Sequence, residues 1–348
     1  MIKEIEKILV IKLRAIGDVV LSTIVLENLR LAFPAARIDF LTEDFCKEVV
    51  LGNPILNKIL VFDRHSLNNL SSAKRFRENL KFVQDVRNQQ YDLVFDFFGN
   101  PRSAFLTWIT GAKVRVGYDY RVRKNAYTHI VNSRADTVHE AEWHLDALKA
   151  LDIPIVEEKL NFEVGRGSRK FAESFWNENH LQGERVVALN FSGGWPTKKW
   201  PIDRFAHLAD ILIEKYNTKV LILWGPGERE AALHLAKLVT NSTILIPDTN
   251  LKQLAAILEK VDFVVTTDSG PMHIAAAMGT PCVALFGPTN YKLQGPFGDI
   301  HEIVTRDGLD CLGCNRTSCD NLVCMNTLTV EYVLDAVDRC ITFNSLFK

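Results

Sequence analysis

The stretch ILVIKLRAIGDV at positions 8–19 decides the fold. Four consecutive apolar residues, Ile8 to Ile11, are typical of a parallel strand that is buried on both faces. A turn containing Gly17 follows this run. Residues 19–33 then have the pattern of a helix, which Pro34 ends. The chain therefore begins with the strand–turn–helix unit of an α/β protein.

The same alternation of strand and helix continues and then restarts after residue 165. A charged stretch with two glycines, residues 157–167, separates the two halves. Strands that alternate with helices predict βαβ units and parallel sheets. We expect two doubly wound α/β domains, residues 1–165 and 166–328, followed by an amphipathic helix within 329–348. The predicted strands are 8–11, 38–41, 59–62, 93–97, 186–190, 220–224, 243–246, 263–267 and 282–286.

The composition excludes several classes of protein. The chain has 348 residues, 47% of them hydrophobic, with 41 Lys and Arg against 42 Asp and Glu. Collagen, coiled coils and extensive disorder do not have this composition. Nucleic-acid binders usually carry a strong basic excess, which is missing here. The first residues lack a signal-peptide pattern, and no apolar run of about 18 residues predicts a membrane span. We expect a cytoplasmic protein that contacts the membrane surface peripherally.

Ligands of open parallel sheets bind at the carboxyl ends of the strands. The loop Asp268-Ser269-Gly270-Pro271-Met272-His273 follows one such strand and opens a helix. Free backbone N–H groups at a helix start favour an anion, and Asp268 and His273 add polar groups there. A simple capped helix is the structural alternative.

Three further loops of the second half follow strands. In 225–230, Glu228 or Glu230 would hold ribose hydroxyls, or would only favour the helix dipole. In 193–201, Thr197 and two lysines, Lys198 and Lys199, suit a phosphate, or form a solvated pair. The segment 287–289 carries Thr289. Together the four loops describe a nucleotide-diphosphate site better than any one of them does.

The first half offers one carboxylate and one basic stretch. Asp18, after the first strand, is either a helix cap or a general base in a cleft between the domains. Residues 113–134 contain six basic residues and one acidic residue, with Arg102 just upstream. This stretch is either a solvated basic face or a docking surface for an anionic acceptor.

Two patterns raise the question of metal. In HEAEWH at 139–144 the histidines are five residues apart, and a zinc helix needs four. No metal is therefore expected there. Cys311, Cys314, Cys319 and Cys324 form a second cluster. They are either structural thiols, unpaired or bridged, or a zinc or iron–sulfur site.

The quoted segments 8–19, 198–201, 268–273 and 287–289 together resemble the ADP-heptose:lipopolysaccharide heptosyltransferases, glycosyltransferase family 9. The resemblance covers nearly the whole chain. It implies a GT-B architecture of two Rossmann-like domains, with the terminal helix crossing back to pack on the first. It also implies an inverting transfer that needs no metal or other cofactor.

The resemblance assigns roles residue by residue. The first domain would bind an anionic glycolipid acceptor at the inner face of the cytoplasmic membrane, and the second would bind the ADP-sugar. Asp18 would be the catalytic base. The donor would be bound by Thr197, Lys198, Glu228 or Glu230, Asp268, Ser269, Gly270, Met272, His273 and Thr289. The acceptor would face Arg14, Arg102, Arg121, Arg123, Lys124 and His139.

Two other functions remain open at this point. A GT-B transferase could use a different nucleotide sugar, and a nucleotide-sugar 2-epimerase would need no acceptor at all. A binding protein that has lost its activity is a third reading, and the intact set of Asp18, Lys198 and Asp268 argues against it.

Overall fold

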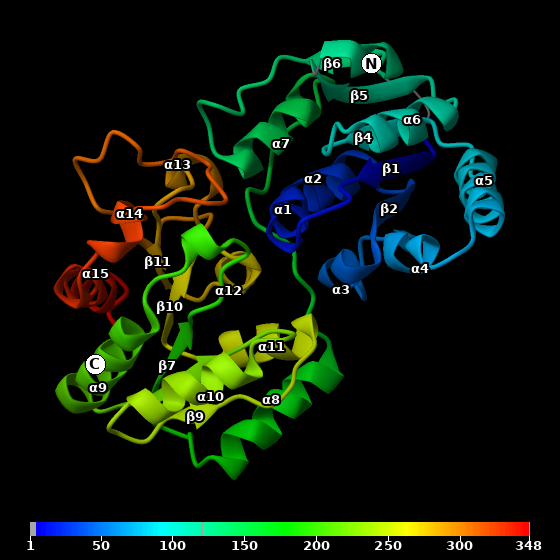
Figure 1. Ribbon diagram of the computed structural model, residues 1–348. Helices are drawn as coiled ribbons and strands as arrows, with labels where there is room; N and C mark the ends of the chain where they lie inside the picture. Colours follow the sequence, from blue (N-terminus) through cyan, green and yellow to red (C-terminus); the bar gives the residue numbers. More distant parts are fainter. Residues whose placement is uncertain (1–4, 120, 348) are drawn as a thin grey trace. The chain divides into compact units, whose positions relative to one another are not determined.

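The computed structural model describes residues 5–119 and 121–347 and divides the chain into two units. Unit 1 is Met1–Glu163 and unit 2 is Val164–Lys348. Each unit contains a six-stranded sheet in which all pairings are parallel (Figure 1). The break between the units falls inside the charged stretch 157–167.

The unit 1 sheet has the order β3-β2-β1-β4-β5-β6. The central strand β1 pairs with β2 and β4, so Ile8 lies between Ile38 and Leu93. Its residues Ile8 to Ile11 are fully buried, as the uninterrupted apolar run predicts. The strands are β1 (Lys7–Ile11), β2 (Arg37–Glu43), β3 (Lys58–Phe62), β4 (Leu93–Asp96), β5 (Val114–Tyr118) and β6 (His129–Val131).

Helices cover both faces of this sheet (Figure 1). One face carries α1 (Ile16–Ser22), α2 (Ile24–Ala32) and α7 (Glu140–Lys149), and the other carries α5 (Ser72–Asn88) and α6 (Pro101–Ile109). Shorter elements are η1 (Asp44–Cys46), α3 (Lys47–Val50), α4 (Arg64–Asn68) and η2 (Arg121–Ala126).

The single helix predicted for residues 19–33 is two helices that meet at Thr23. The Thr23 hydroxyl donates a hydrogen bond back to the Val20 carbonyl at 2.6 Å and accepts one from the Asn161 backbone. Such bonds from a threonine compete with the regular helical pattern. The apolar periodicity continues through the break, which is why the sequence did not reveal it.

The unit 2 sheet repeats the topology of the first. Its order is β12-β11-β10-β7-β8-β9, which is 3-2-1-4-5-6 when counted from β7, the Rossmann order. The order reverses between β1 and β4 in unit 1 and between β7 and β10 in unit 2. The strands are β7 (Arg185–Asn190), β8 (Thr218–Leu223), β9 (Ile244–Leu245), β10 (Phe263–Thr267), β11 (Cys282–Leu285) and β12 (Glu302–Val304).

The helices of unit 2 also lie in two layers. Three of them, α9 (Ile202–Tyr216), α10 (Arg229–Leu238) and α15 (Val330–Phe343), share one apolar core with the sheet. The others, α8 (Arg166–Glu178), α11 (Leu251–Leu258) and α12 (Gly270–Ala277), contact one another on the opposite face (Figure 1). Short elements are η3 (Pro196–Lys198), α13 (Tyr291–Gln294) and α14 (Val323–Asn326).

The terminal helix was expected to pack on the first domain, and this expectation is wrong. The apolar stripe of α15, including Val333, Val337 and Cys340, is fully buried in the core of unit 2, against α9, β11 and β12. The stripe has the right spacing for a buried helix face, but spacing does not say which surface the helix covers.

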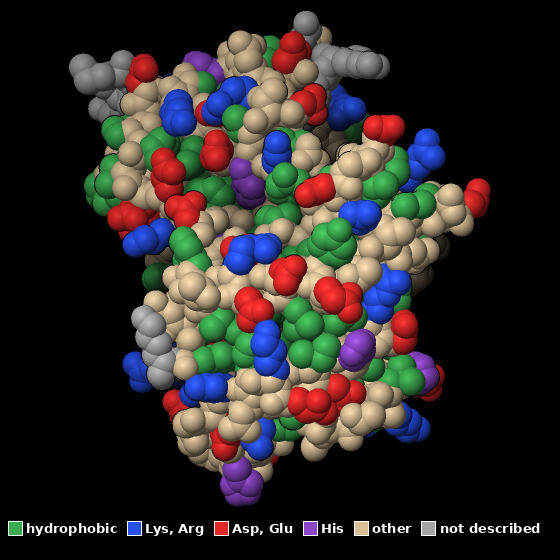
Figure 2. All heavy atoms as spheres, turned by 90° about the vertical axis from the view of Figure 1, so that its left-hand side faces the viewer, with side chains coloured by type: hydrophobic (Ala, Val, Ile, Leu, Met, Phe, Trp, Pro, Cys, Tyr) green, Lys and Arg blue, Asp and Glu red, His purple; other side chains and the backbone are tan. Residues whose placement is uncertain are grey.

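Over residues 5–119 and 121–347, we find no helix with both the length and the apolarity to cross a bilayer. Acidic and basic side chains are intermixed on the face of the molecule in Figure 2. This agrees with the net charge of −1.

Candidate functional site

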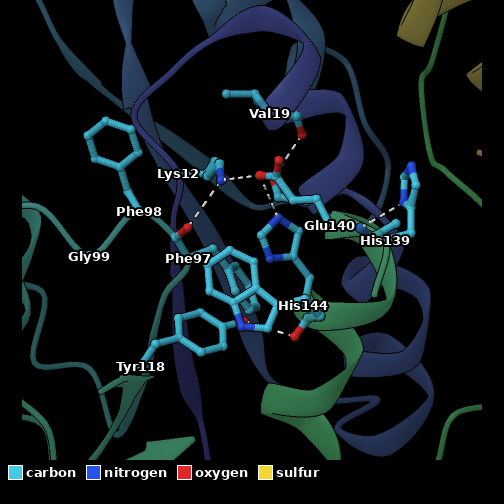
Figure 3. A network of polar contacts seen from close by, with 12 residues as sticks. Lys12, Val19, Phe97, Phe98, Gly99, Tyr118, His139, Glu140 and His144 are labelled. Carbon is cyan, nitrogen blue, oxygen red and sulfur yellow. Dashed lines mark hydrogen bonds and ion pairs between the residues drawn. The ribbon is translucent and has the colours of Figure 1, made fainter. Parts of the chain in front are cut away.

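In unit 1, a buried lysine joins the loops that follow β1 and β4. Lys12 comes directly after β1, and its Nζ donates a hydrogen bond to the Phe97 carbonyl at 3.1 Å. The same Nζ lies 2.6 Å from Oε1 of Glu140, at the start of α7 (Figure 3). The side chains of Lys12 and Glu140 are only 4% and 11% exposed. This ion pair sits where the strand order reverses, the usual ligand position in such sheets.

Charges in this network determine one another's protonation. Burial alone would lower the pKa of Lys12, but the carboxylates of Glu140 and Asp18 outweigh it and raise that pKa. Burial would raise the pKa of Glu140, yet Lys12 and His144 hold it well below its usual range. The His144 Nε2 lies 3.5 Å from Glu140 Oε1. Burial, aided by the positive Lys12, lowers the pKa of His144 to about 4, so its ring is neutral at pH 7.

Asp18 lies beside this ion pair. It occupies the first turn of α1 and is half-buried. Its charge acts on Lys12 and also contributes to the raised pKa of Cys46, which burial mainly causes. The structure therefore brings the predicted base together with Lys12 and Glu140, two residues that the sequence had not singled out as a pair.

The predicted acceptor residues near the same edge have different surroundings. Arg14 is exposed, with its Nε 4.0 Å from Oε1 of Glu43. The Arg102 guanidinium lies over the Phe62 ring, 4.4 Å from its centroid. Arg123 donates to the Gly99 carbonyl at 2.5 Å, in the loop after β4. The side chains of Arg121 and Lys124 lie outside the described part of the structure.

His139 and the basic stretch 113–134, both predicted to face the acceptor, make hydrogen bonds within unit 1. His139 is the N-cap of α7, and its Nδ1 accepts a hydrogen bond from the Ala141 backbone at 3.2 Å. In the basic stretch, Arg115 donates to the Ala112 and Ala126 carbonyls. Arg134 forms a two-bond pair with Asp146. Arg115 and Arg134 therefore stabilise the fold of unit 1 through these hydrogen bonds.

In unit 2, a side-chain amide at the equivalent position connects the loops that follow β7 and β10. Asn190 ends β7, and its side-chain amide donates to the hydroxyls of Thr266 at 2.8 Å and Ser269 at 2.7 Å. The Thr267 hydroxyl donates to the Ser192 carbonyl. These bonds fix the loop after β10 against the loop after β7, so the polar groups of both loops gather at one edge.

Lys198 and Asp268 form an ion pair at this edge. The Lys198 Nζ lies 2.7 Å from Oδ2 of Asp268, and the two side chains are 14% and 7% exposed. The Thr289 hydroxyl donates to the same Oδ2 at 2.5 Å. Lys198 also lies over the Trp195 ring, 4.4 Å from its centroid. Three of the four loops that the sequence singled out therefore contribute to one cluster.

The N-terminus of α12 adjoins this ion pair. Ser269 is the N-cap residue, but its side chain makes no cap hydrogen bond, so the alternative of a simple side-chain-capped helix does not apply. Its hydroxyl donates instead to the Thr267 carbonyl at 3.1 Å. Gly270 is half-buried, whereas Met272 and His273 are buried in the fold. A helix start without a side-chain cap is suited to an anionic group.

The two glutamates of the loop after β8 differ in position. Glu228 accepts hydrogen bonds from the Ser192 hydroxyl and, at 3.0 Å, from the Gly225 backbone. Its carboxylate is therefore fixed at the ligand edge of the sheet. Glu230 lies in the first turn of α10 and is exposed. The geometry favours Glu228 as the residue that faces a ligand.

Hydrogen bonds tie the segment 306–322, called here the cysteine segment, to the loops that follow β7 and β11. The buried Thr197 donates to the Arg316 carbonyl at 2.8 Å. The Gly313 backbone donates to the Gly287 carbonyl, and the Asn315 backbone donates to the Pro288 carbonyl. The Thr197 hydroxyl thus holds this segment, a structural contact that the sequence did not predict.

The four clustered cysteines are free thiols. Cys311, Cys314 and Cys319 are exposed, and Cys324 is buried. Over residues 5–119 and 121–347 no group of three or more His, Cys, Asp or Glu side chains is arranged to hold a metal ion. The zinc or iron–sulfur alternative for these cysteines therefore finds no support in the geometry.

Sequence reasoning missed several residues of these clusters. Lys12, Asn190 and Ser192 all lie at or just beyond the end of a buried strand. A polar residue directly after an apolar run was the available signal, since such positions face the ligand edge. Glu140 gave no such signal because its partner Lys12 is far away in the sequence.

Comparisons with known proteins place the chain in one family. Residues 79–323 match the family model described as glycosyltransferase family 9 (heptosyltransferase). The chain is 27% identical over 323 residues to lipopolysaccharide heptosyltransferase 1 of Pseudomonas aeruginosa, covering 90% of this chain and 87% of that protein. It is 29% identical over 314 residues to lipooligosaccharide heptosyltransferase 2 of Haemophilus ducreyi, covering 83% and 86%.

Solved structures confirm the two-domain GT-B fold. A glycosyl transferase family 9 protein from Veillonella parvula superposes with a TM-score of 0.85 at 24% identity, covering 99% of both chains. The E. coli heptosyltransferase WaaC with ADP gives a TM-score of 0.74 at 21% identity, covering 96% of this chain and 99% of that one.

Proposed function

The chain belongs to glycosyltransferase family 9 and is a glycosyltransferase, and we propose that it moves a heptose from ADP-heptose to the inner core of lipopolysaccharide or a related surface glycan. Two relatives that match most of its length are named as a lipopolysaccharide and a lipooligosaccharide heptosyltransferase. One structural neighbour contains ADP, and another contains ADP-2-deoxy-2-fluoro heptose. The observation that carries the proposal is the Lys198–Asp268 pair beside the start of α12.

Unit 2 would bind the donor through this cluster. Lys198 would neutralise the diphosphate. The backbone N–H groups of Ser269 and Gly270 at the start of α12 would add partial positive charge beside it. Asp268, held by Thr289, would accept hydrogen bonds from the donor sugar. Glu228 would hold the ribose hydroxyls. Met272 and His273, which are buried, would support the helix start from within the unit.

Unit 1 would supply the base. Asp18 would take the proton from the acceptor hydroxyl, which attacks the anomeric carbon in line while ADP leaves from the opposite face. The configuration at that carbon inverts. Lys198 and the α12 dipole would stabilise the charge that develops on the leaving diphosphate, so the reaction would need no metal. The acceptor would be an anionic glycolipid at the inner face of the cytoplasmic membrane.

Calorimetry of nucleotide binding tests the donor assignment. We expect ADP to bind more tightly than UDP or GDP, and we expect the affinity for ADP to be unchanged in EDTA. ADP-heptose would bind at the same site. A preference for UDP or GDP would retain the GT-B fold and reject heptose transfer from ADP-heptose.

Replacement of Asp18 tests the mechanism. Asp18→Asn should lower kcat by about 10²–10⁴-fold, the range for loss of a general base. ADP affinity should be unchanged because unit 2 holds the nucleotide. Near-normal turnover in a folded variant would show that Asp18 is not the base.

A further inference from the structure

The outer sides of α5 and α6 form one continuous layer of unit 1. Val86 of α5 and Leu106 of α6 pack into the same core cluster as Leu9 and Ile11 of β1. The two helices also contact each other (Figure 1). Their opposite sides therefore face outward together, and we name this area the α5–α6 surface.

Large apolar side chains are exposed on the α5–α6 surface. Phe76 is 71% exposed and Leu80 is 54% exposed, one helical turn apart on α5. On α6, Phe105 is 46% and Trp108 is 54% exposed, and their ring centroids are 6.2 Å apart. Of the 17 residues of α5, only Val86 is buried. Exposed large apolar side chains on two adjacent helices are a feature of interaction sites.

The same surface is basic. Lys74, Arg77 and Lys81 follow one another at helical spacing and so form one stripe on α5. The whole helix carries five basic and two acidic residues, a net charge of +3 in a chain whose net charge is −1. Aromatic side chains set among long basic ones are typical of proteins that lie on an anionic membrane surface.

A shallow hollow lies at the edge of the surface. It measures about 250 Å³ and is lined by Phe105, Trp108 and Arg123 together with Ala104, Asn125 and Ala126. Aromatic rings with one cation suit the zone where lipid phosphates meet acyl chains.

The α5–α6 surface begins at the edge of the sheet that carries Asp18. Helix α6 starts at Pro101, shortly after Phe97, whose carbonyl accepts the Lys12 hydrogen bond. An acceptor held in a bilayer beneath this surface would thus be presented to the edge where the base lies.

We propose that the α5–α6 surface docks the protein on an anionic lipid bilayer, with Phe76, Leu80, Phe105 and Trp108 in the headgroup region. The choice of a membrane over a protein partner follows from the basic charge of α5, which complements an anionic lipid surface. It also rests on the proposed function, because a glycolipid acceptor is itself part of a bilayer.

Sedimentation with vesicles tests the docking. The full chain is mixed with vesicles of phosphatidylcholine containing 30% phosphatidylglycerol, or of phosphatidylcholine alone. Binding should require the anionic lipid and weaken at high salt. The triple variant K74E/R77E/K81E should bind at least about 100-fold more weakly, since each basic residue near the surface contributes about fivefold. F105S/W108S should also lose binding at low salt.

Matched controls carry the same changes on unit 2. K170E/K219E/K237E replaces three exposed lysines, and Phe343→Ser replaces a side chain that is 65% exposed. These variants should bind vesicles like the parent chain. Equal losses in surface and control variants, or no vesicle binding by the parent chain, would overturn the proposal. Dimers of the parent chain that dissociate in F105S/W108S would also overturn the proposal, because the α5–α6 surface would then join two copies of the chain.

The enzymatic assignment is tested separately in the same variants. ADP affinity and transfer to an acceptor stripped of its acyl chains should be unchanged in K74E/R77E/K81E, while transfer to acceptor in vesicles should fall. If neither the parent chain nor any variant binds ADP, the proposed function is contradicted, whereas the vesicle result still tests the docking independently.

Discussion

The Lys12–Glu140 pair makes a sharp prediction for Lys12→Met. Methionine has a similar length and fills the space, so the main change is the loss of the cation that lies 2.6 Å from the Glu140 carboxylate. Because both side chains are almost fully buried, the carboxylate cannot recover its partner from solvent. Breaking a buried pair from one side costs about 3–5 kcal/mol. For a unit of this size we expect the melting temperature to fall by about 6–20 °C.

The effect should depend on pH in a defined direction. In the parent chain the pKa of Glu140 is held low, so its contribution to the free energy of unfolding is present above about pH 4.5 and is lost as the pH falls. In Lys12→Met the burial of Glu140 acts without the lysine and raises its pKa. The deficit of the variant should therefore be largest at pH 7 and smaller at pH 5.

Urea unfolding at pH 7 and pH 5 measures this deficit. The double variant K12M/E140M removes both charges and should recover most of the lost stability, since well-packed apolar pairs replace buried ion pairs at little cost. Lys47→Met is the control, because its partner Asp44 is about half exposed and such pairs contribute little. A loss below about 1 kcal/mol in Lys12→Met, or a double variant as unstable as the sum of its singles, would refute the reasoning.

Three further predictions concern the remaining charged groups. Lys198→Ala should raise the KM for the donor, lower kcat, or both, in steady-state kinetics; unchanged values would remove its phosphate role. Glu228→Gln should weaken ADP binding in calorimetry while the matched Glu230→Gln should not, and equal effects would contradict the placement of Glu228. In the unfolded chain His144 takes up a proton near pH 6.5, whereas its pKa in the fold is lowered to about 4. Through His144 the free energy of unfolding should therefore fall by about 2 kcal/mol from pH 7 to pH 5, in addition to the fall caused by His301, whose pKa burial also lowers to about 4. His144→Phe should reduce the total fall by about 2 kcal/mol, and an unchanged slope in the variant would mean that His144 does not contribute to it.

Local sequence patterns predicted nine of the twelve strands found in residues 5–119 and 121–347, and they missed β5 and the sheet-edge strands β6 and β12. The uninterrupted apolar runs, such as Ile8 to Ile11, lie in the buried centre of each sheet because both faces are covered by helices. Polar loops after such runs gather at one edge because all strands are parallel. Lys198, Asp268 and Thr289 are brought together by this geometry alone.

Long-range partners could not be predicted in the same way. Lys12 and Glu140 are 128 residues apart, and only the folded sheet brings α7 beside the end of β1. Asn190 ends a predicted strand, but its bonds to Thr266 and Ser269 depend on the register of β7 against β10. The terminal helix was placed wrongly for the same reason, because the apolar stripe predicts a buried helix face but does not identify the surface that this face packs against.

The cysteine segment offers a way to observe the loops that follow β7 and β11 directly. Its backbone is hydrogen-bonded to Gly287 and Pro288, and Thr197 bonds to its Arg316 carbonyl. Cys311, Cys314 and Cys319 on the same segment are exposed, whereas Cys46, Cys282, Cys324 and Cys340 are buried. A thiol-reactive fluorophore would therefore label this one place in the native chain without engineering. Its signal would report movement of the loops around Lys198 and Thr289 as a nucleotide enters and leaves.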